Sequence, residues 1–437
     1  MTLPRDEKPF LVLRTTSRVL RDPVGYYGEA VGRLGPIYRT RAMNGELVVV
    51  ANHALAREVF ALPPEATGPF AVDALRGLLG MGSVFCMGGA RHARERRMLT
   101  PAFHGPRMEA FGEAIRAVVQ RVLEGWSDGQ TVVAAEALVP ITFEIIVRVV
   151  FGVDDPERIA SFLALTQRMV AAASPALLFF PATQVRFLGL TPFDRLLAVR
   201  KQVDEALQFE IDERRRSGAR GNDVLSLLMD ATWEDGERVP DDHVRDELIT
   251  LLFAGHETTS IAVAWALYEL ARHPDALETL RAELATTDGS LQALARLPYL
   301  DAVWQETLRL HPPLSDILRE VLQPVTVGGH RVEAGENLVV ATCWMAMDPE
   351  VFPAPEAWDP TRWLGTKPPP FQVLPFGGGN RRCLGAALAT FEAQIAIATF
   401  VTALDFTSLR EEEAVRRNAT MGPKHGVRLA VSRRAEA

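Results

Sequence analysis

The sequence predicts a mainly α-helical protein with small β-sheets. Six stretches place apolar residues at the three- and four-residue spacing of helices that pack against a core. These stretches are 115–126, 140–151, 196–216, 241–273, 277–285 and 300–310. Strand-like segments are few and gather near the two ends of the chain. We therefore expect a helix-rich body with a small sheet towards each end.

Two short hairpins are the clearest β signals. Residues 37–41 and 47–51 flank Asn44-Gly45, a dipeptide typical of tight hairpin turns. Residues 325–327 and 331–332 flank Gly328-Gly329 in the same way. Residues 337–342 form one further candidate strand.

Composition indicates a soluble globular protein. Of the 437 residues, 48% are hydrophobic and 23% charged, and the net charge of −8 does not suggest nucleic-acid binding. Three cysteines are too few for a disulfide framework, so we expect a reducing compartment, the cytoplasm. The apolar run at 9–13 is short and is interrupted by Arg14, so we expect no signal peptide or membrane anchor.

The longest predicted helix carries polar groups at its centre. It begins at Asp241-Asp242 and ends before Pro274, as helix-boundary preferences predict. At roughly 1.5 Å per residue it would be about 50 Å long. Its middle places Glu257, Thr258 and Thr259 in an otherwise apolar stretch. Taken alone, these residues fit a functional acid–alcohol pair no better than a purely structural arrangement, in which Glu257 points to solvent and Thr258 bonds a carbonyl of its own helix.

Residues 376–385 combine a glycine-rich turn with Cys383. Glycines permit positive φ and let the backbone approach a large flat group closely. A predicted helix at 386–400 puts Cys383 just before a helix N-terminus, a location that favours the thiolate. A single thiolate is a soft ligand that suits haem iron. An ordinary loop thiol is the alternative for an arbitrary cysteine.

This segment resembles the haem-binding signature Phe-x-x-Gly-x-Arg-x-Cys-x-Gly of the cytochrome P450 family. Its fixed positions are all filled, by Phe376, Gly379, Arg381, Cys383 and Gly385. The resemblance implies a single cytochrome P450 domain over residues 1–437, with haem b between the long central helix and the cysteine loop. It also implies that Cys383 is the axial metal ligand, that Phe376 packs beside it and that Arg381 pairs with a haem propionate.

The centre of the long helix is similar to the family's Ala-Gly-x-(Asp/Glu)-Thr-Thr motif. The resemblance implies that Ala254 and Gly255 leave space for haem and oxygen. It implies that Thr258 donates a hydrogen bond to bound dioxygen and that Glu257 relays protons from water, which makes these two the expected catalytic residues. His256 precedes Glu257 by one position and so lies on another helix face, and we give it no part in the mechanism.

Further charged residues match the family's structural and haem-binding positions. Glu306 and Arg309, three apart on one helix, resemble its Glu-x-x-Arg motif, which Arg362 completes as a buried triad. A surface pair of little energetic value is the alternative. His92, Arg96 and Arg319 resemble propionate-binding positions, and with Arg381 they give a four-member clamp for two carboxylates.

Three more arginines, Arg94, Arg97 and Arg382, then remain for a basic patch that suits an acidic ferredoxin. Plain solubilising charge explains them nearly as well.

The resemblance places the substrate pocket among apolar segments. These are 70–87, taken as a loop, and 179–187, 252–254, 314–318 and 420–423. Their apolar residues include Val84, Phe85, Phe179, Phe180, Ile317 and Met421, and each of them fits plain core packing as well. Asp316 is the exception, because its carboxylate either bonds a substrate or faces the protein.

We predict a monomeric, cytoplasmic haem-thiolate monooxygenase without a fused reductase. It would insert one atom of O₂ into a lipophilic substrate, such as a fatty acid, terpenoid or steroid, with electrons from ferredoxin and ferredoxin reductase. A peroxide-driven haem-thiolate enzyme is one alternative, and Glu257 and Thr258 argue against it. A non-catalytic haem binding or sensor protein is the other, and it would not need Thr258.

Overall fold

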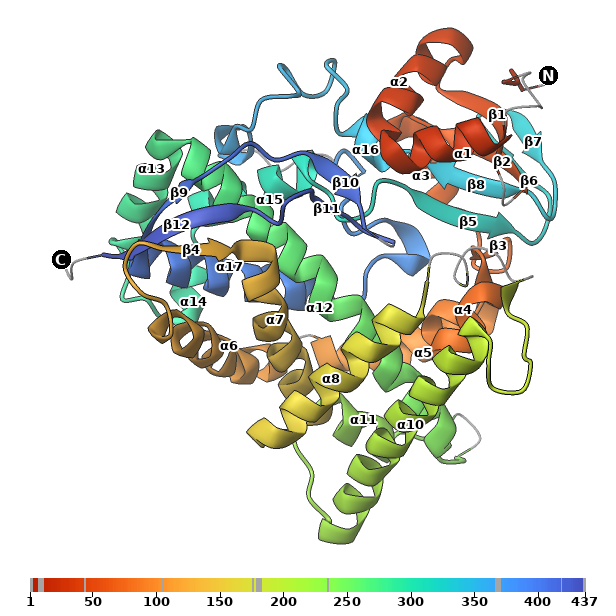
Figure 1. Cartoon of the computed structure of the whole chain (residues 1–437). Helices are drawn as coiled ribbons and strands as arrows, with labels where there is room; N and C mark the ends of the chain where they lie inside the picture. The colour runs from red at the N-terminus through yellow and green to blue at the C-terminus, as the bar shows by residue number, and fades with distance from the viewer. Residues whose placement is uncertain are drawn as a thin grey trace. The chain divides into compact units, whose positions relative to one another are not determined.

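A computed structural model of the chain describes residues 3–6, 12–42, 45–103, 106–174, 177, 183–233, 236–365, 371–417 and 419–434. The chain divides into two compact units (Figure 1). The first comprises Met1–Phe70, Ile115–Leu138 and Thr258–Ala437, and the second comprises Ala71–Ala114 and Val139–Glu257. That the whole chain acts as one integrated domain stays a prediction.

The main sheet of the first unit has the order β1-β2-β8-β5-β3 (Figure 1). Its strands are β1 (Ile37–Ala42), β2 (Gly45–Val50), β8 (Asn337–Val340), β5 (Ile317–Val321) and β3 (Thr67–Pro69). The predicted hairpin of β1 and β2 is confirmed, with Ile37 opposite Val50. The expected separation of N-terminal and C-terminal sheets is wrong, because β2 pairs in parallel with β8. A parallel pair needs a long crossover, which local sequence patterns do not reveal.

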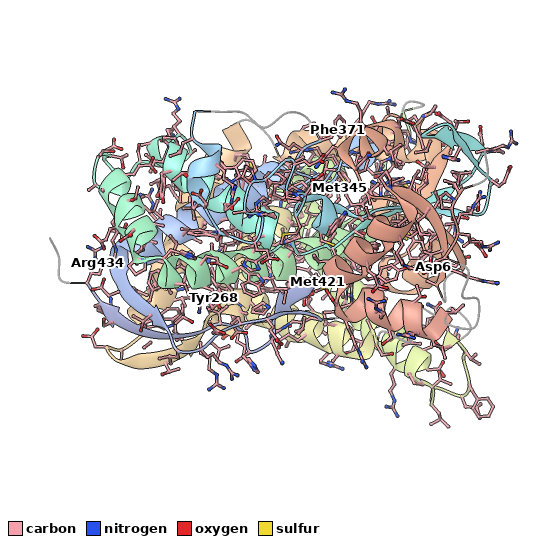
Figure 2. All side chains as sticks on the ribbon, turned by 90° about the horizontal axis from the view of Figure 1, so that it is seen from above. Asp6, Tyr268, Met345, Phe371, Met421 and Arg434 are labelled. Carbon is pink, nitrogen blue, oxygen red and sulfur yellow. The ribbon has the colours of Figure 1, made fainter. Side chains whose placement is uncertain are left out.

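Burial on both faces explains why the central strands are almost entirely apolar. Val48, Val50 and Leu338 face a core that includes residues of α3 (His53–Phe60). Met345 belongs to this core and Phe371 packs against it, and both are labelled in Figure 2. The alternate residues Val49 and Val339 face a second core with residues of α2 (Pro23–Leu34).

Three smaller sheets complete the strands of this unit. β4 (Gln130–Val133), β12 (Arg428–Arg433) and β9 (Leu404–Ser408) form one sheet in that order. β6 (Val325–Val327) and β7 (His330–Val332) form the second predicted hairpin, which is confirmed. β10 (Ala414–Arg416) pairs with β11 (Met421–Pro423). Most of the strands that the sequence analysis missed are short, but β9 and β12 do alternate between buried and more exposed residues.

The predicted helices of the first unit are confirmed with boundaries shifted by a few residues. They are α6 (Pro106–Glu124), which begins in the second unit, α13 (Pro274–Leu284) and α15 (Pro298–Leu310). The predicted helix at 386–400 is confirmed as α17 (Ala386–Ala403). Additional helices are α1 (Val12–Arg21), α14 (Leu291–Leu294) and α16 (Thr342–Met345). α17 packs against α13, α14 and α15, so its apolar residues lie in the core.

The second unit is helical. Its helices are α4 (Val72–Leu79), α5 (Gly89–Leu99), α7 (Ala134–Phe151), α8 (Pro156–Ala172), α10 (Pro192–Ser217) and α11 (Val224–Asp230). Side-chain caps set several of the N-termini: Asp155 accepts from the first turn of α8, and Thr191 forms a capping box with Asp194 on α10. The expected loop at 70–87 is wrong, because α4 and the 3₁₀ turn Val84–Cys86 lie there.

The long predicted helix is confirmed as α12 (Asp241–Arg272), and the division between the units falls within it, after Glu257. α12 and α17 are long and apolar enough for a membrane span by length and composition. However, 72% and 61% of their most apolar windows are buried in the protein, as is typical of core helices.

Candidate functional site

The loop before α17 has a shape that only glycine allows. Gly377 and Gly379 have φ of +68° and +66°. A β-carbon on Gly378 would lie 2.7 Å from the ring of Phe60, and one on Gly379 would overlap the Phe60 carbonyl oxygen. A β-carbon on Gly385 would meet nothing within 4 Å. The turn therefore requires glycine at 378 and 379 to pass the end of α3, whereas the protein places no such demand on position 385.

Backbone hydrogen bonds fix Cys383 at the end of this loop. Its N–H donates to the carbonyl oxygen of Phe376 at 2.8 Å, and the N–H of Arg382 donates to Gly379 at 3.2 Å. The 3₁₀ turn Gly379–Arg381 precedes the cysteine, and α17 begins at Ala386. The predicted position of Cys383, just before a helix N-terminus, is confirmed, and the residue is exposed. The positive end of the helix dipole favours a thiolate there.

Two arginines come together beside this loop. Burial and the nearby Arg381 guanidinium lower the pKa of Arg319 to about 10. Arg319, on β5, donates from Nη1 to the carbonyl oxygen of Leu318 at 2.9 Å. Over the described ranges, no carboxylate lies within ion-pair distance of Arg319. The charge of Arg319 beside Arg381 favours an anion at this place.

Together these features fit a haem. A thiolate-favouring cysteine provides an iron ligand, the glycine turn allows close approach of a flat group, and the arginine pair suits a carboxylate tail. Cys383, Phe376, Arg381 and Arg319 all belong to the first unit.

His92 and Arg96 lie one turn apart on α5 of the second unit, and His92 is buried. Arg319 thus lies near Arg381, and His92 and Arg96 lie on one face of α5.

The centre of α12 is polar and partly buried. Glu257, Thr258 and Ala254 are intermediate in exposure, and Thr259 is buried. Gly255 has a packing role within the second unit, because a β-carbon there would lie 2.8 Å from Ile146 of α7. The expectation that Gly255 also leaves space for haem and oxygen stays a prediction.

His256 faces α7 rather than the polar residues beside it. Its Nδ1 lies 2.8 Å from the carbonyl oxygen of Leu252, and its ring meets Phe143 edge-on at 5.9 Å. Thr142 donates to the backbone carbonyl of His256 at 2.8 Å. Burial lowers the pKa of His256, so the imidazole is neutral at pH 7. Its exclusion from the mechanism agrees with this position.

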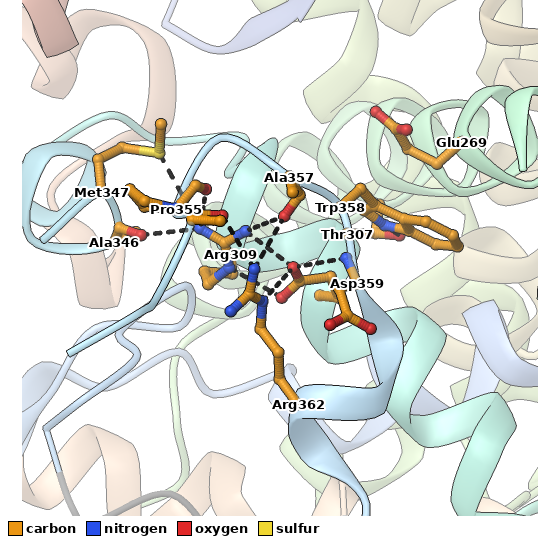
Figure 3. A network of polar contacts seen from close by, with 12 residues as sticks. Glu269, Thr307, Arg309, Ala346, Met347, Pro355, Ala357, Trp358, Asp359 and Arg362 are labelled. Carbon is orange, nitrogen blue, oxygen red and sulfur yellow. Dashed lines mark hydrogen bonds and ion pairs between the residues drawn. The ribbon is translucent and has the colours of Figure 1, made fainter. Parts of the chain in front are cut away.

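The predicted Glu306–Arg309–Arg362 triad is present in the first unit (Figure 3). Arg309 donates to both oxygens of Glu306 at 2.8 Å, and Arg362 Nε donates to one of them at 3.1 Å. Neither Glu306 nor Arg309 has exposed side-chain surface. The Asp359 amide and the Trp363 indole N–H supply two more donors to the carboxylate. The weak surface pair is thereby excluded.

Carbonyl groups complete the shell around the two arginines. Arg309 donates to the carbonyl oxygens of Ala346, Pro355 and Ala357. Arg362 donates to those of Pro353 and Ala354. The network in Figure 3 therefore ties α15 to the segment 346–363 with its donors and acceptors satisfied.

Asp316 faces the protein. It accepts hydrogen bonds from the Tyr27 hydroxyl at 3.1 Å and from Ser315 Oγ at 2.9 Å. Burial raises the pKa of its carboxyl. Asp316 therefore has a structural role just before β5, and the alternative that it bonds a substrate is set aside.

The remaining residues of the predicted pocket and basic patch differ in their exposure. Val84 and Met421 are buried, and Phe85 is 48% exposed. Phe179 and Phe180 lie outside the described residues. Arg94 is partly buried and stacks over the Trp233 ring at 4.1 Å, and its part in a basic patch stays a prediction.

Two features escaped the sequence analysis. Phe60, which shapes the glycine turn, gave no local signal. The buried group of Glu95, His243 and Glu247 did have a local sequence signal, because His243 and Glu247 lie four residues apart on an apolar helix.

The family model for cytochrome P450 matches residues 14–428. The chain belongs to the cytochrome P450 family. It is 34% identical over 406 residues to cytochrome P450 137 of Mycobacterium tuberculosis, covering 91% of this chain and 83% of the relative. It is 34% identical over 420 residues to cytochrome P450 138 of Mycobacterium bovis, covering 93% and 91%.

Solved structures show the same fold. The retinoic acid-bound cyanobacterial CYP120A1 matches with a TM-score of 0.84 and 26% identity, covering 96% of each chain. The haem domain of cytochrome P450DA matches with a TM-score of 0.85 and 22% identity, covering 99% of this chain and 98% of that one. The protein is thus a cytochrome P450, an oxidoreductase of the haem-thiolate monooxygenase class, and its cofactor is a haem.

Proposed function

We propose that this cytochrome P450 binds haem b through Cys383 and oxygenates a lipophilic substrate. The cysteine loop carries the proposal. Its positive-φ glycines and the backbone bond from Cys383 to Phe376 present one sulfur at the start of α17. Arg381 and Arg319 would hold one propionate, His92 and Arg96 the other, and Phe376 would pack beside the sulfur.

When bound, the haem would supply reductive activation of O₂, with electron density from the thiolate. The protein's part is to bind, orient and protonate. Thr258 Oγ1 would donate a hydrogen bond towards the oxygen site, and the Glu257 carboxyl would exchange protons with water and pass them to Thr258. Ala254 would leave room on the same helix. The apolar surroundings would keep bulk water away, so that protons arrive along this route alone.

We also propose a substrate class and an electron donor. The predicted pocket segments are apolar, which favours a fatty acid, terpenoid, steroid or similar metabolite. We propose a ferredoxin as electron donor, with Arg97 and Arg382 in its docking surface. We further propose a monomer that acts in the cytoplasm.

Replacing the ligand tests the proposal most directly. Cys383→His should abolish the far-red-shifted Soret band of the reduced carbonyl complex, because an imidazole lacks the thiolate's charge. The matched control is Cys86→Ser, which removes a partly buried thiol of the second unit and should leave the band in place. A shifted band that survives in Cys383→His would reject Cys383 as the ligand.

A second experiment separates oxygenation from the alternatives. With surrogate ferredoxin and reductase, Thr258→Ala should divert electrons to hydrogen peroxide while nicotinamide oxidation continues. Thr279→Ala is the control, since that exposed hydroxyl bonds its own helix at Asp275. Unchanged coupling in Thr258→Ala would remove Thr258 from proton delivery. An original protein that forms no product with nicotinamide electrons would favour a peroxide-driven enzyme or a haem sensor.

A further inference from the structure

The second unit contains a buried group of three potential metal ligands. Glu95 comes from α5, and His243 and Glu247 lie one turn apart on α12. One ligand atom from each lies within 4.8 Å of the other two. Glu95 and Glu247 are 0% exposed and His243 is 8% exposed.

The carboxylate oxygens of this group lack donors. Nε2 of His243 lies 2.8 Å from Oε1 of Glu95. The other oxygen of Glu95 and both oxygens of Glu247 are buried and accept no hydrogen bond from the part of the chain that the structure describes. Buried carboxylate oxygens rarely stay in this state, because they lose water and gain nothing in return. Three such oxygens on residues whose ligand atoms lie within 4.8 Å of one another indicate a missing positive centre.

Neighbouring cations are already engaged elsewhere. Arg200 pairs with Asp246 and donates to the carbonyl of Leu78. Arg94 stacks on Trp233, whose ring also meets the His243 ring edge-on at 5.1 Å. Arg245 bonds Gln208. Among the described residues no lysine or arginine forms an ion pair with Glu95 or Glu247.

The charge balance favours a divalent ion. Two carboxylates need two positive charges to remain ionised away from water, and a protonated His243 supplies one at most. One divalent cation would neutralise both carboxylates and give their buried oxygens a partner.

The donor set narrows the choice of ion. One imidazole nitrogen and two carboxylate oxygens suit zinc and similar first-row transition metals. Calcium and magnesium prefer six or more oxygen ligands, which this group does not offer.

We propose that Glu95, His243 and Glu247 form a binding site for one divalent transition-metal ion that joins α5 to α12. The ion would fix α5 at Glu95, the residue before Arg96, and would hold the helix that carries His92. Because its ligands must be deprotonated, binding would release protons, and the ion would stabilise the folded second unit.

Zinc stoichiometry tests the site. Tag-free, haem-loaded protein is equilibrated with micromolar zinc and desalted, and zinc is measured by mass spectrometry against haem iron. We expect about one zinc per chain in the original protein. Glu247→Gln and His243→Ala should weaken zinc binding by more than the roughly 10–100-fold that loss of an outer-shell partner costs.

The matched control is Glu269→Gln. Glu269 is also a buried glutamate of α12, it bonds His311 at 2.6 Å, and it belongs to no group of three potential metal ligands among the described residues. Zinc content should not change in this variant. The reduced-carbonyl spectrum and circular dichroism report the fold of each variant, so loss of zinc with an intact spectrum isolates the site from the haem.

Three results would overturn the proposal. The original protein binds no zinc, or the variants bind it as tightly as the original. The third is an infrared band of a protonated carboxyl that persists in the original protein in excess zinc and disappears in Glu247→Gln. Such a band would show that Glu95 and Glu247 share a proton instead of binding a metal ion. If neither variant folds, anomalous scattering at the zinc edge from crystals of the original protein decides, by showing or lacking an ion between the three side chains.

Discussion

At the scale of single residues, Arg319 carries a positive charge that is largely removed from water, which is unfavourable. Burial and the adjacent Arg381 lower its pKa from the ordinary arginine value to about 10. That difference corresponds to at most about 3 kcal/mol of unfavourable charge burial in the haem-free protein. Below pH 10 the guanidinium is charged in both the folded and unfolded chain, so the cost is fully present at neutral pH and falls only as the pH rises through about 10.

Arg319→Met should therefore change stability and haem retention in opposite directions. We expect the haem-free variant to resist urea better, by up to about 3 kcal/mol. The haem-loaded variant should release its haem faster, as measured by transfer to excess apomyoglobin. Arg331→Met, which removes an exposed partner of Glu333, should alter neither quantity. A less stable haem-free variant with normal haem retention would contradict a propionate role for Arg319.

Single residues also show where sequence patterns stop. The i−1 position of His256 correctly predicts that it turns away from Glu257, because helix geometry fixes that angle. The orientation of Asp316 was open, because Tyr27, which donates to it, lies far away in the sequence.

At the scale of elements, the glycine turn before α17 depends on α3. Gly379→Ala places a β-carbon against the Phe60 carbonyl at a φ of +66°. The turn must then move, and Cys383 with it. We expect this variant to be expressed with little bound haem, measured as the ratio of Soret to protein absorbance.

Gly385→Ala is the comparison within the same signature. Its β-carbon meets no protein atom within 4 Å, and its φ is −85°. Without haem, Gly385→Ala should unfold at the same thermal midpoint as the original protein, and Gly379→Ala should unfold at a lower one. Equal midpoints would mean that the turn relaxes without cost.

The Glu306–Arg309–Arg362 network joins elements rather than residues. Arg309→Ala leaves the Glu306 carboxylate buried with too few donors, so we expect a loss of about 3–5 kcal/mol in the free energy of unfolding. Urea denaturation measures it. Glu413→Ala, which breaks the exposed pair with Lys424, should leave the urea midpoint unchanged. A similarly small effect for Arg309→Ala would show that the network is dispensable.

At the scale of the whole molecule, Glu392 on α17 should shape the pH dependence of stability. Burial raises the pKa of its carboxyl well above the usual range, and one of its oxygens accepts no hydrogen bond from the described residues. Between the unfolded and folded pKa values the folded chain binds more protons, so stability falls as the pH rises in that window. The slope is at most about 1.4 kcal/mol per pH unit.

Glu392→Gln should remove this slope. We expect urea midpoints equal to those of the original protein near pH 4 and higher at pH 8. Glu350→Gln, an exposed change, serves as control. A Glu392→Gln variant that is less stable at pH 8 would mean that the carboxylate is ionised and stabilised by a partner.

Much of this protein was readable in the sequence. The hairpins, the long helix, the cysteine before a helix and the Glu306–Arg309 pair all arise from residues close together in the chain, where periodicity and turn chemistry act directly. The family signature added the proposed haem ligand for the same reason, since its ten positions are contiguous.

Tertiary structure alone decided what depends on distant segments. It joined β2 to β8 in parallel, set Phe60 against Gly379, buried Arg319 beside Arg381 and brought Glu95 to His243 and Glu247. Local patterns do not encode such pairings, because they follow from how complete elements pack and which charges they remove from water.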